Sequence, residues 1–397
     1  MTTRPPGHVQ GHAARLWVTL ALFIAGCAHP VSPNQGQGAL QEGRVDLTWA
    51  QQVLQEGSES SDVSTRRAAV AHLVALETQA GGGDWGAIGA FDPNPWVQRA
   101  TIEVLAERLD EDRSRGLLEV VVSRSDLEPA TRALAARALL EAEVTGVSER
   151  LEDCLSHPPW RAAPCALVLA SQGDGDALEV LIQALNEGDL AVNLPFLEQV
   201  AESGLTELAT PLETGLEWSE EEMQLAVAAA LFGLGSRTGE EHLKKVLRSG
   251  TEERRMEVVD LIAEQQGPEA ESLLRSVTTR DLDGASGLAR AALVTRGVLP
   301  IRVALQMSSS EDREIRAAAC DALGSATGSR EQTLARRSLR DALSDPDFIV
   351  SITSIRALAR IGQPSDRPFL AILGQSDVEE VRVEVAAALL LLTPAPS

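Results

Sequence analysis

Aromatic side chains are scarce in this chain. Tyrosine is absent, and phenylalanine, tryptophan and tyrosine together make up 3% of the residues. Runs that alternate Val, Ile, Thr or Tyr with polar residues are also missing, which argues against β-sheet. Alanine and leucine, both strong helix formers, carry most of the 44% hydrophobic content of the 397 residues. We therefore expect packed helices around a large core.

Basic residues are also scarce. Lys244 and Lys245 are the only lysines, so nearly all basic side chains are arginines, and the formal net charge is −23. Such an acidic surface repels phosphate backbones and anionic lipids. It excludes nucleic acid as the expected partner and is compatible with basic proteins or cations.

The chain has four cysteines, too few for a disulfide-stapled fold. Cys154 and Cys165 are close in sequence and expected on neighbouring helices, so they could form one bridge. Alternatively these two thiols and Cys320 are small buried apolar groups. The chain contains no Cys-x-x-Cys motif.

Motifs that carry catalysis are missing as well. His72, His157 and His242 stand far apart, and the chain has no His-Glu-x-x-His, Gly-x-Ser-x-Gly or phosphate-binding loop. The acidic runs at 220–222 and 240–241 are typical of solvated helix starts. We expect no enzyme activity, no catalytic residue, no metal and no cofactor.

The N-terminal segment has the pattern of an export signal. Arg4 and Arg15 are followed by the apolar stretch Leu16–Ala25, which is too short for a permanent membrane span. Ile24-Ala25-Gly26-Cys27 resembles the lipobox of bacterial lipoproteins. That resemblance implies a signal peptide over 1–26 and a diacylglycerol on Cys27, which anchors the protein. The alternative is a soluble secreted protein whose cysteine is incidental.

The resemblance also suggests where in the cell the protein is located. Ala28 follows the cysteine, and in enterobacteria-like cells a residue other than Asp there favours the outer membrane facing the periplasm. Residues 27–43 are rich in Pro, Gly, Asn and Gln. We interpret them as a flexible tether, able to reach tens of ångströms at ~3 Å per residue.

Residues 44–394 are built from a repeat. The segments Ser310–Gly324, Asp345–Gly362 and Ser376–Leu392 each open with a helix-capping residue and continue with apolar residues at i, i+3, i+4 and i+7. Equivalent positions recur about every 31 residues, which is a solenoid period. The anchors of the repeat are Arg66, Val97, Arg132, Arg161, Val192, Gln224, Arg255, Leu288, Ile315, Val350 and Val381.

These repeats resemble short HEAT-like repeats of the phycobilisome-lyase type, D-P-x-x-x-V-R-x-x-A-x-x-A-L-x-x-L-G. Asp345-Pro346, Val350 and Gly362 match that pattern, although Ser351 stands where the family has Arg. The resemblance implies an all-α, right-handed α-solenoid of about eleven two-helix repeats, with the second helices on the concave face. We expect a curved rod on the order of 100 Å long, whose two ends need caps. Its cap helices would be Val45–Gly57 and Val378–Leu392.

Basic residues on the expected second helices are candidate partner-binding sites. They could contact an acidic segment, or they could be ordinary solvated residues. The candidates are Arg336, Arg337, Arg340, Lys244, Lys245 and Arg248.

Two further sets of residues at the helix starts have two interpretations each. Arg316 and Arg382 occupy the family's Arg position and either contact a partner or form a ladder with acids such as Asp312 or Asp377. Tryptophans open three first helices, either as packing caps or as ligand platforms. They are Trp96, Trp160 and Trp218.

Together these patterns predict a non-enzymatic protein–protein interaction scaffold. The lipid-anchored solenoid would offer its groove to another protein of the bacterial cell envelope. One alternative is a HEAT-like enzyme of the lyase type, which basic clustering on one face would favour. Another is a structural lipoprotein that binds cations on its acidic surface.

Overall fold

The computed structural model describes residues 47–76, 83–186, 194–218, 221–279 and 284–393. Every regular element within these ranges is helical, from α1 to α21 with four short 3₁₀ segments. The predicted signal peptide and tether, with Cys27, lie outside the described residues.

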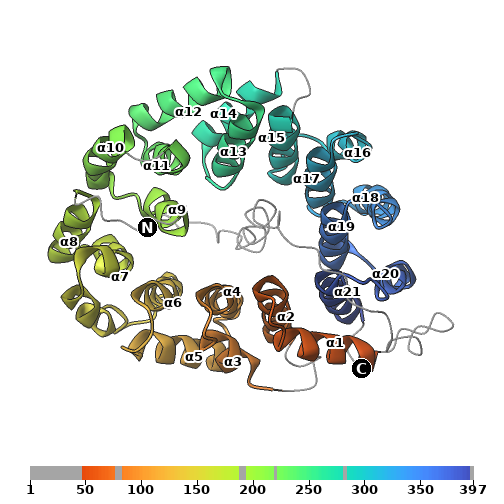
Figure 1. Cartoon of the computed structure of the whole chain (residues 1–397), viewed down its shortest axis with the longest axis horizontal. Helices are drawn as coiled ribbons and strands as arrows, with labels where there is room; N and C mark the ends of the chain where they lie inside the picture. Colours follow the sequence, from red (N-terminus) through yellow and green to blue (C-terminus); the bar gives the residue numbers. More distant parts are fainter. Residues whose placement is uncertain (1–46, 77–82, 187–193, 219–220, 280–283, 394–397) are drawn as a thin grey trace, which may run out of the picture.

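The helices form two concentric layers (Figure 1). Within the described residues the inner layer has eleven helices, each in contact with the next. They are α2 (Val63–Ala75), α4 (Pro95–Ala106), α6 (Pro129–Glu141), α7 (Pro159–Ser171), α9 (Leu194–Ser203), α11 (Glu221–Gly233), α13 (Glu252–Ala263), α15 (Gly284–Thr295), α17 (Arg313–Leu323), α19 (Phe348–Ile361) and α21 (Glu379–Leu391).

The outer layer covers the inner one and is made of shorter or more polar helices. They are α1 (Leu47–Ser58), α3 (Trp85–Ala90), α5 (Asp112–Ser123), α8 (Gly175–Asn186), α10 (Ala209–Trp218), α12 (Arg237–Ser249), α14 (Pro268–Thr278), α16 (Arg302–Met307), α18 (Ser329–Ala342) and α20 (Arg367–Leu373). Between α6 and α7 the outer position is taken by η2 (Ser148–Arg150) and η3 (Glu152–Ser156). The remaining 3₁₀ segments are η4 (Thr206–Leu208) and η5 (Pro364–Asp366).

The repeat count and the anchors are confirmed. Ten of the anchors each lie in a different inner helix, and Val192, just ahead of α9, lies outside the described residues. The chain is therefore an all-α solenoid with one inner helix per repeat. The expected layer order is wrong, because the second helices of the repeats lie on the outer, convex side.

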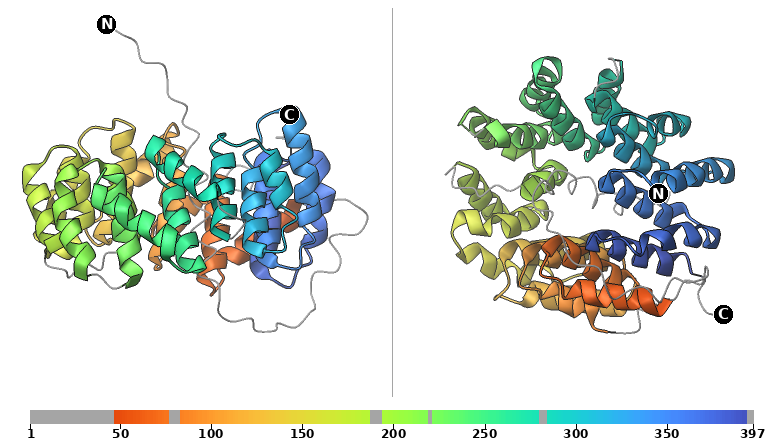
Figure 2. Two further views of the ribbon diagram at one scale, coloured as in Figure 1. Left: turned by 90° about the horizontal axis from the view of Figure 1, so that it is seen from above. Right: turned by 45° about the vertical axis from the view of Figure 1, so that its right-hand side comes forward.

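The expectation of a curved rod with two capped ends is also wrong, because the solenoid closes into a ring (Figures 1 and 2). Helices α1 and α2 at the start of the chain pack against α21 at its end. The two predicted cap helices therefore cover each other instead of two free ends. We call this contact between α1, α2 and α21 the seam.

An apolar cluster of its own holds the seam together. Leu54 of α1, Leu73 of α2 and Val383 of α21 are each 0% exposed. Gly57 of α1 makes the close approach possible, because a Cβ there would lie 2.8 Å from Cγ2 of Val383. Burying each large aliphatic side chain stabilises the closed form by about 1.5–3 kcal/mol.

Small residues allow the inner helices to approach closely around the whole ring. Alanines such as Ala133, Ala228, Ala289 and Ala319 are completely buried. Because alanine occupies little volume, adjacent helices pack tightly and their cores join into large clusters.

Candidate functional site: the rim at the N termini of the inner helices

The N termini of successive inner helices lie side by side on one rim of the ring. Glu252, at the start of α13, accepts a 2.9 Å hydrogen bond from the backbone N–H of Gly284, the first residue of α15. Arg161 at the start of α7 reaches Glu128 just ahead of α6 at 3.1 Å. These contacts join neighbouring N termini along this rim.

One turn is repeated at the start of five of these helices. The side-chain oxygen of a first residue accepts a hydrogen bond from the backbone N–H two residues later, at 2.7–3.3 Å. In four of the five turns that later residue is Asp or Asn and caps the helix through its own side chain. The five pairs are Ser60 and Asp62, Asp92 and Asn94, Ser310 and Asp312, Asp345 and Asp347, and Ser376 and Val378.

The same turn is closed by a second, equally regular contact. The backbone carbonyl of the first residue accepts a hydrogen bond from the side chain six residues later, at 2.6–3.3 Å. The donors are Arg66, Gln98, Arg316, Ser351 and Arg382. Ser351, where the family has Arg, thus makes the same carbonyl contact with a shorter side chain.

The helices that begin with this turn are consecutive in the ring. They follow the order α17, α19, α21, α2 and α4, so the regular arc crosses the seam. The first and last repeats of the chain therefore share one local structure, and closing the ring makes that structure continuous.

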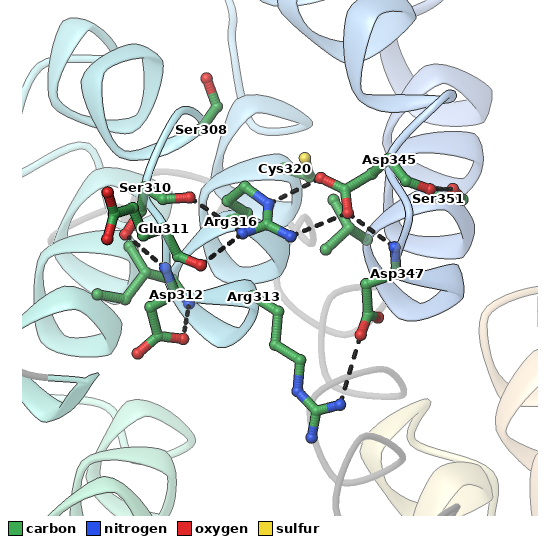
Figure 3. A network of polar contacts seen from close by, with 12 residues as sticks. Ser308, Ser310, Glu311, Asp312, Arg313, Arg316, Cys320, Asp345, Asp347 and Ser351 are labelled. Carbon is green, nitrogen blue, oxygen red and sulfur yellow. Dashed lines mark hydrogen bonds and ion pairs between the residues drawn. The ribbon is translucent and has the colours of Figure 1, made fainter.

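Ion pairs connect neighbouring turns in this arc (Figure 3). Arg316 donates two hydrogen bonds to the carboxylate of Asp345, at 2.7 and 3.0 Å, while also bonding loop carbonyls of its own turn. The hydrogen bond from Arg316 holds the pKa of Asp345 below its ordinary value. Arg66 reaches Asp92 in the same way at 3.2 Å.

Arg316 thus forms the predicted ladder contact, but its partner is a different acid from the predicted one. Arg316 bonds Asp345 of the next repeat, whereas Asp312 caps its own helix. Arg382 donates to the carbonyl of Ser376 at 2.7 Å instead of to Asp377.

A buried charge network crosses the seam one turn deeper. Glu384 of α21 is 2% exposed and lies 2.7 Å from Arg356 of α19 and 3.1 Å from His72 of α2. Burial alone would raise the pKa of Glu384, but the Arg356 guanidinium and the His72 ring hold it well below its ordinary value. Glu384 therefore links the last two inner helices to the first.

Apolar side chains stand exposed on this same rim. Trp96 and Trp160 occupy the first turns of α4 and α7 and are 51% and 46% exposed, and Phe348 begins α19 at 38%. Val378, the N-cap of α21, is 41% exposed. The packing-cap interpretation therefore fits Trp96 and Trp160 poorly. Trp218 ends α10 and does not open a first helix, which corrects the expected position.

The predicted basic sites lie on outer helices, so their expected place on the concave face is wrong. Arg336 and Arg340 of α18 both bond Asp366, which is 0% exposed, and Arg340 also covers the ring of Phe369 at 4.6 Å. These two arginines therefore attach α18 to the start of α20.

The other basic candidates are more solvated. Lys244 pairs with Glu240 one turn earlier in α12, at 2.5 Å. Arg337 of α18 and Lys245 and Arg248 of α12 are exposed. Partner binding at these residues stays a prediction.

The three cysteines of the described residues are free thiols and completely buried. The thiol of Cys165 donates a 3.4 Å hydrogen bond to the carbonyl of Pro129. The interaction between the two thiols lowers the pKa of Cys154 and raises that of Cys165. The expectation that the two lie on neighbouring elements is thus confirmed, η3 and α7 being in contact.

The described part of the chain lacks two further features. No helix there is long and apolar enough to cross a bilayer. No three His, Cys, Asp or Glu side chains there are grouped so that they could hold a metal ion.

Comparison with known proteins identifies the repeats at the C-terminal end of the chain. The family model of HEAT repeats matches residues 301–390, which include α17, α19 and most of α21, all in the regular arc. No curated protein sequence matches the chain.

Solved structures that resemble this one include an engineered protein that is 19% identical, with a TM-score of 0.31, where the match covers 87% of this chain and 98% of that chain. Human deoxyhypusine hydroxylase in complex with glycerol is 16% identical, with a TM-score of 0.27 and coverages of 79% and 95%. A second engineered protein is 17% identical, with a TM-score of 0.24 and coverages of 77% and 94%. Residues 301–390, which match the family model, are an array of helices.

Proposed function

We propose that this protein is a non-enzymatic scaffold for protein–protein interaction, anchored to the bacterial cell envelope by a lipid on Cys27. The observation that carries the proposal is the rim, where regular turns from both ends of the chain form one surface and expose aromatic side chains. A ring of HEAT-like repeats buries its core between helices and leaves such rims for a partner.

Support for the anchor comes from the sequence. The lipobox-like Ile24-Ala25-Gly26-Cys27 follows a short apolar segment, and Ala28 favours the outer membrane facing the periplasm. Metabolic labelling with a radioactive fatty acid tests this part. Label should enter the wild-type protein, and the Cys27→Ser variant should stay unlabelled.

Support for a role without catalysis comes from the polar groups of the ring. In the regular arc Arg66 pairs with Asp92 and Arg316 pairs with Asp345 of the next repeat, which is a structural use of charge. The acidic net charge of −23 points to a protein partner with basic groups.

A cross-linking pull-down from detergent-solubilised envelopes tests the scaffold. The native protein and the Cys27→Ser variant serve as baits, and we expect one protein to be enriched with the anchored bait. If no protein is enriched with either bait, the scaffold proposal is wrong.

A further inference from the structure

Building on the proposed scaffold function, we propose that the part of the rim near the seam binds a basic, apolar segment of a partner protein. We define this surface, the seam rim, by Phe348, Val378, Trp96 and Trp160. It runs over the N termini of α19, α21, α2, α4, α6 and α7.

The exposed apolar groups of the seam rim differ from those elsewhere on the ring. In the described residues, other large exposed apolar side chains lie on outer helices or at the end of α21: Ile88, Val120, Leu334, Phe369, Ile372 and Leu391. On the rim they occupy the N-terminal ends of four inner helices, and two of them are tryptophans. Exposed tryptophan on a rigid turn is typical of residues that dominate binding energy.

The charge around these side chains is negative. Asp377 and Glu379 flank Val378 and are exposed, as are Glu59 and Asp62 at the start of α2, and Glu128 ahead of α6 is 61% exposed. Exposed carboxylates therefore flank Val378 and stand at the starts of α2 and α6, between the apolar groups of the seam rim.

Three arginines of the regular arc are turned toward their own loops, whereas Arg161, beside Trp160 on α7, has a side chain that is 41% exposed and pairs with Glu128 at 3.1 Å. Arg66, Arg316 and Arg382 each donate to a loop carbonyl, so their charge is partly used inside the turns. Lys or Arg side chains of a partner would find both carboxylates and tryptophan faces, the two groups that attract a cation most strongly. A nucleic acid or an anionic membrane would be repelled.

The seam rim exists only in the closed ring. Trp96 and Trp160 come from the first repeats, and Phe348 and Val378 come from the last ones. Ser60 and Glu379 join the two halves directly, with a hydrogen bond of 3.4 Å between their side chains. Partner binding would therefore depend on both the tryptophans and the seam.

The test uses a fluorescein-labelled 12-residue peptide of alternating arginine and leucine, and a control peptide of alternating arginine and serine. Fluorescence anisotropy measures their binding to the purified ring in moderate salt. We expect the Arg-Leu peptide to bind the wild-type ring, and the Trp96→Ala/Trp160→Ala double variant to bind about tenfold more weakly.

The matched control variant is Ile372→Ala on the outer helix α20, where Ile372 is 74% exposed. It should bind the Arg-Leu peptide like wild type, and circular dichroism should show all variants equally folded. The proposal is overturned if the peptide does not bind wild type, if both variants bind equally, or if the Arg-Ser peptide binds as tightly as the Arg-Leu peptide.

Failure of this proposal can be told apart from failure of the scaffold. If the envelope pull-down enriches a partner equally with the wild-type ring and with the Trp96→Ala/Trp160→Ala variant, the scaffold holds and the seam rim is not its binding site. If the pull-down enriches nothing, the scaffold itself is wrong.

Discussion

Nε2 of His72 lies 3.1 Å from Oε2 of Glu384, although the two residues are 312 positions apart in the chain. This contact joins the first inner helix, α2, to the last, α21. Arg356 approaches the other oxygen of the same carboxylate at 2.7 Å. One buried carboxylate thus holds together three inner helices and closes the ring.

Glu384→Leu should therefore destabilise the ring strongly. The substitution leaves the partly buried Arg356 and His72 without their shared acceptor, and breaking a buried pair costs about 3–5 kcal/mol. The free energy of unfolding, measured in urea, should fall by that order. Glu141→Leu is the control, because Glu141 is 57% exposed in its pair with Arg137. Its cost should stay below about 1 kcal/mol, and equal costs for the two variants would contradict a closing role for Glu384.

A larger residue at position 57 should open the seam. In Gly57→Ala the new Cβ meets Cγ2 of Val383 at 2.8 Å and Cβ of Ala69 at 3.0 Å. We expect a loss of stability of about 1–3 kcal/mol and faster hydrogen exchange in α1 and α21. Small-angle X-ray scattering should show a larger radius of gyration where the seam opens.

Two companion variants make this prediction specific. Gly116→Ala in α5 is the control, since nothing lies within 4 Å of its Cβ position, and it should be neutral or slightly stabilising. Adding Val383→Ala to Gly57→Ala removes one of the two clashes and should restore part of the loss. Destabilisation by Gly116→Ala equal to that by Gly57→Ala would show that the close approach to Val383 is not the reason for the loss.

The repeat could be predicted from sequence because its signal is local. Periodic apolar residues and capping residues specify each inner helix, and anchors such as Val97, Ile315 and Val381 lie in the expected helices. The helix-capping residues lie two positions after the ones expected from the sequence. The expected capping residue Asp345 opens the shared turn, and Asp347 is the N-cap of α19. That turn has a readable pattern: Ser60, Asp62 and Arg66 recur with the same spacing as Ser310, Asp312 and Arg316.

Ring closure could not be predicted in the same way. It depends on small rotations between repeats that add up around the whole chain, and no single residue pattern encodes their sum. The contact between Gly57 and Val383 exists only after all repeats have stacked. The seam rim could not be predicted for the same reason, because Trp96 and Phe348 become parts of one surface only when the ends meet.

The cysteines should differ in their reaction with iodoacetamide. The thiolate is the nucleophile, and burial raises the pKa of Cys320 to about 11, whereas the interaction with the Cys165 thiol lowers that of Cys154. All three thiols should react slowly in the native ring at pH 8, with Cys154 modified first and Cys165 and Cys320 at least severalfold later. Peptide mass spectrometry over a time course measures this order, with the urea-unfolded chain as the control in which all three react alike. Modification of Cys320 ahead of Cys154 would contradict the prediction.

Stability should fall as the pH rises past the ordinary pKa of one aspartate in the inner layer. Burial, with Glu257 nearby, raises the pKa of Asp260 in α13 from 3.8 to about 7. Between these two values the unfolded chain releases the proton while the folded ring keeps it. The free energy of unfolding therefore decreases in that window, by about 1.4 kcal/mol for each pH unit.

Asp260→Asn removes the ionisation and should flatten this part of the profile of stability against pH, making the variant more stable than wild type at pH 8. Glu128→Gln, on the exposed rim, is the control and should leave the profile unchanged. Urea unfolding between pH 4 and pH 8 measures both profiles, and a wild-type slope that survives in Asp260→Asn would assign the titration to another carboxylate.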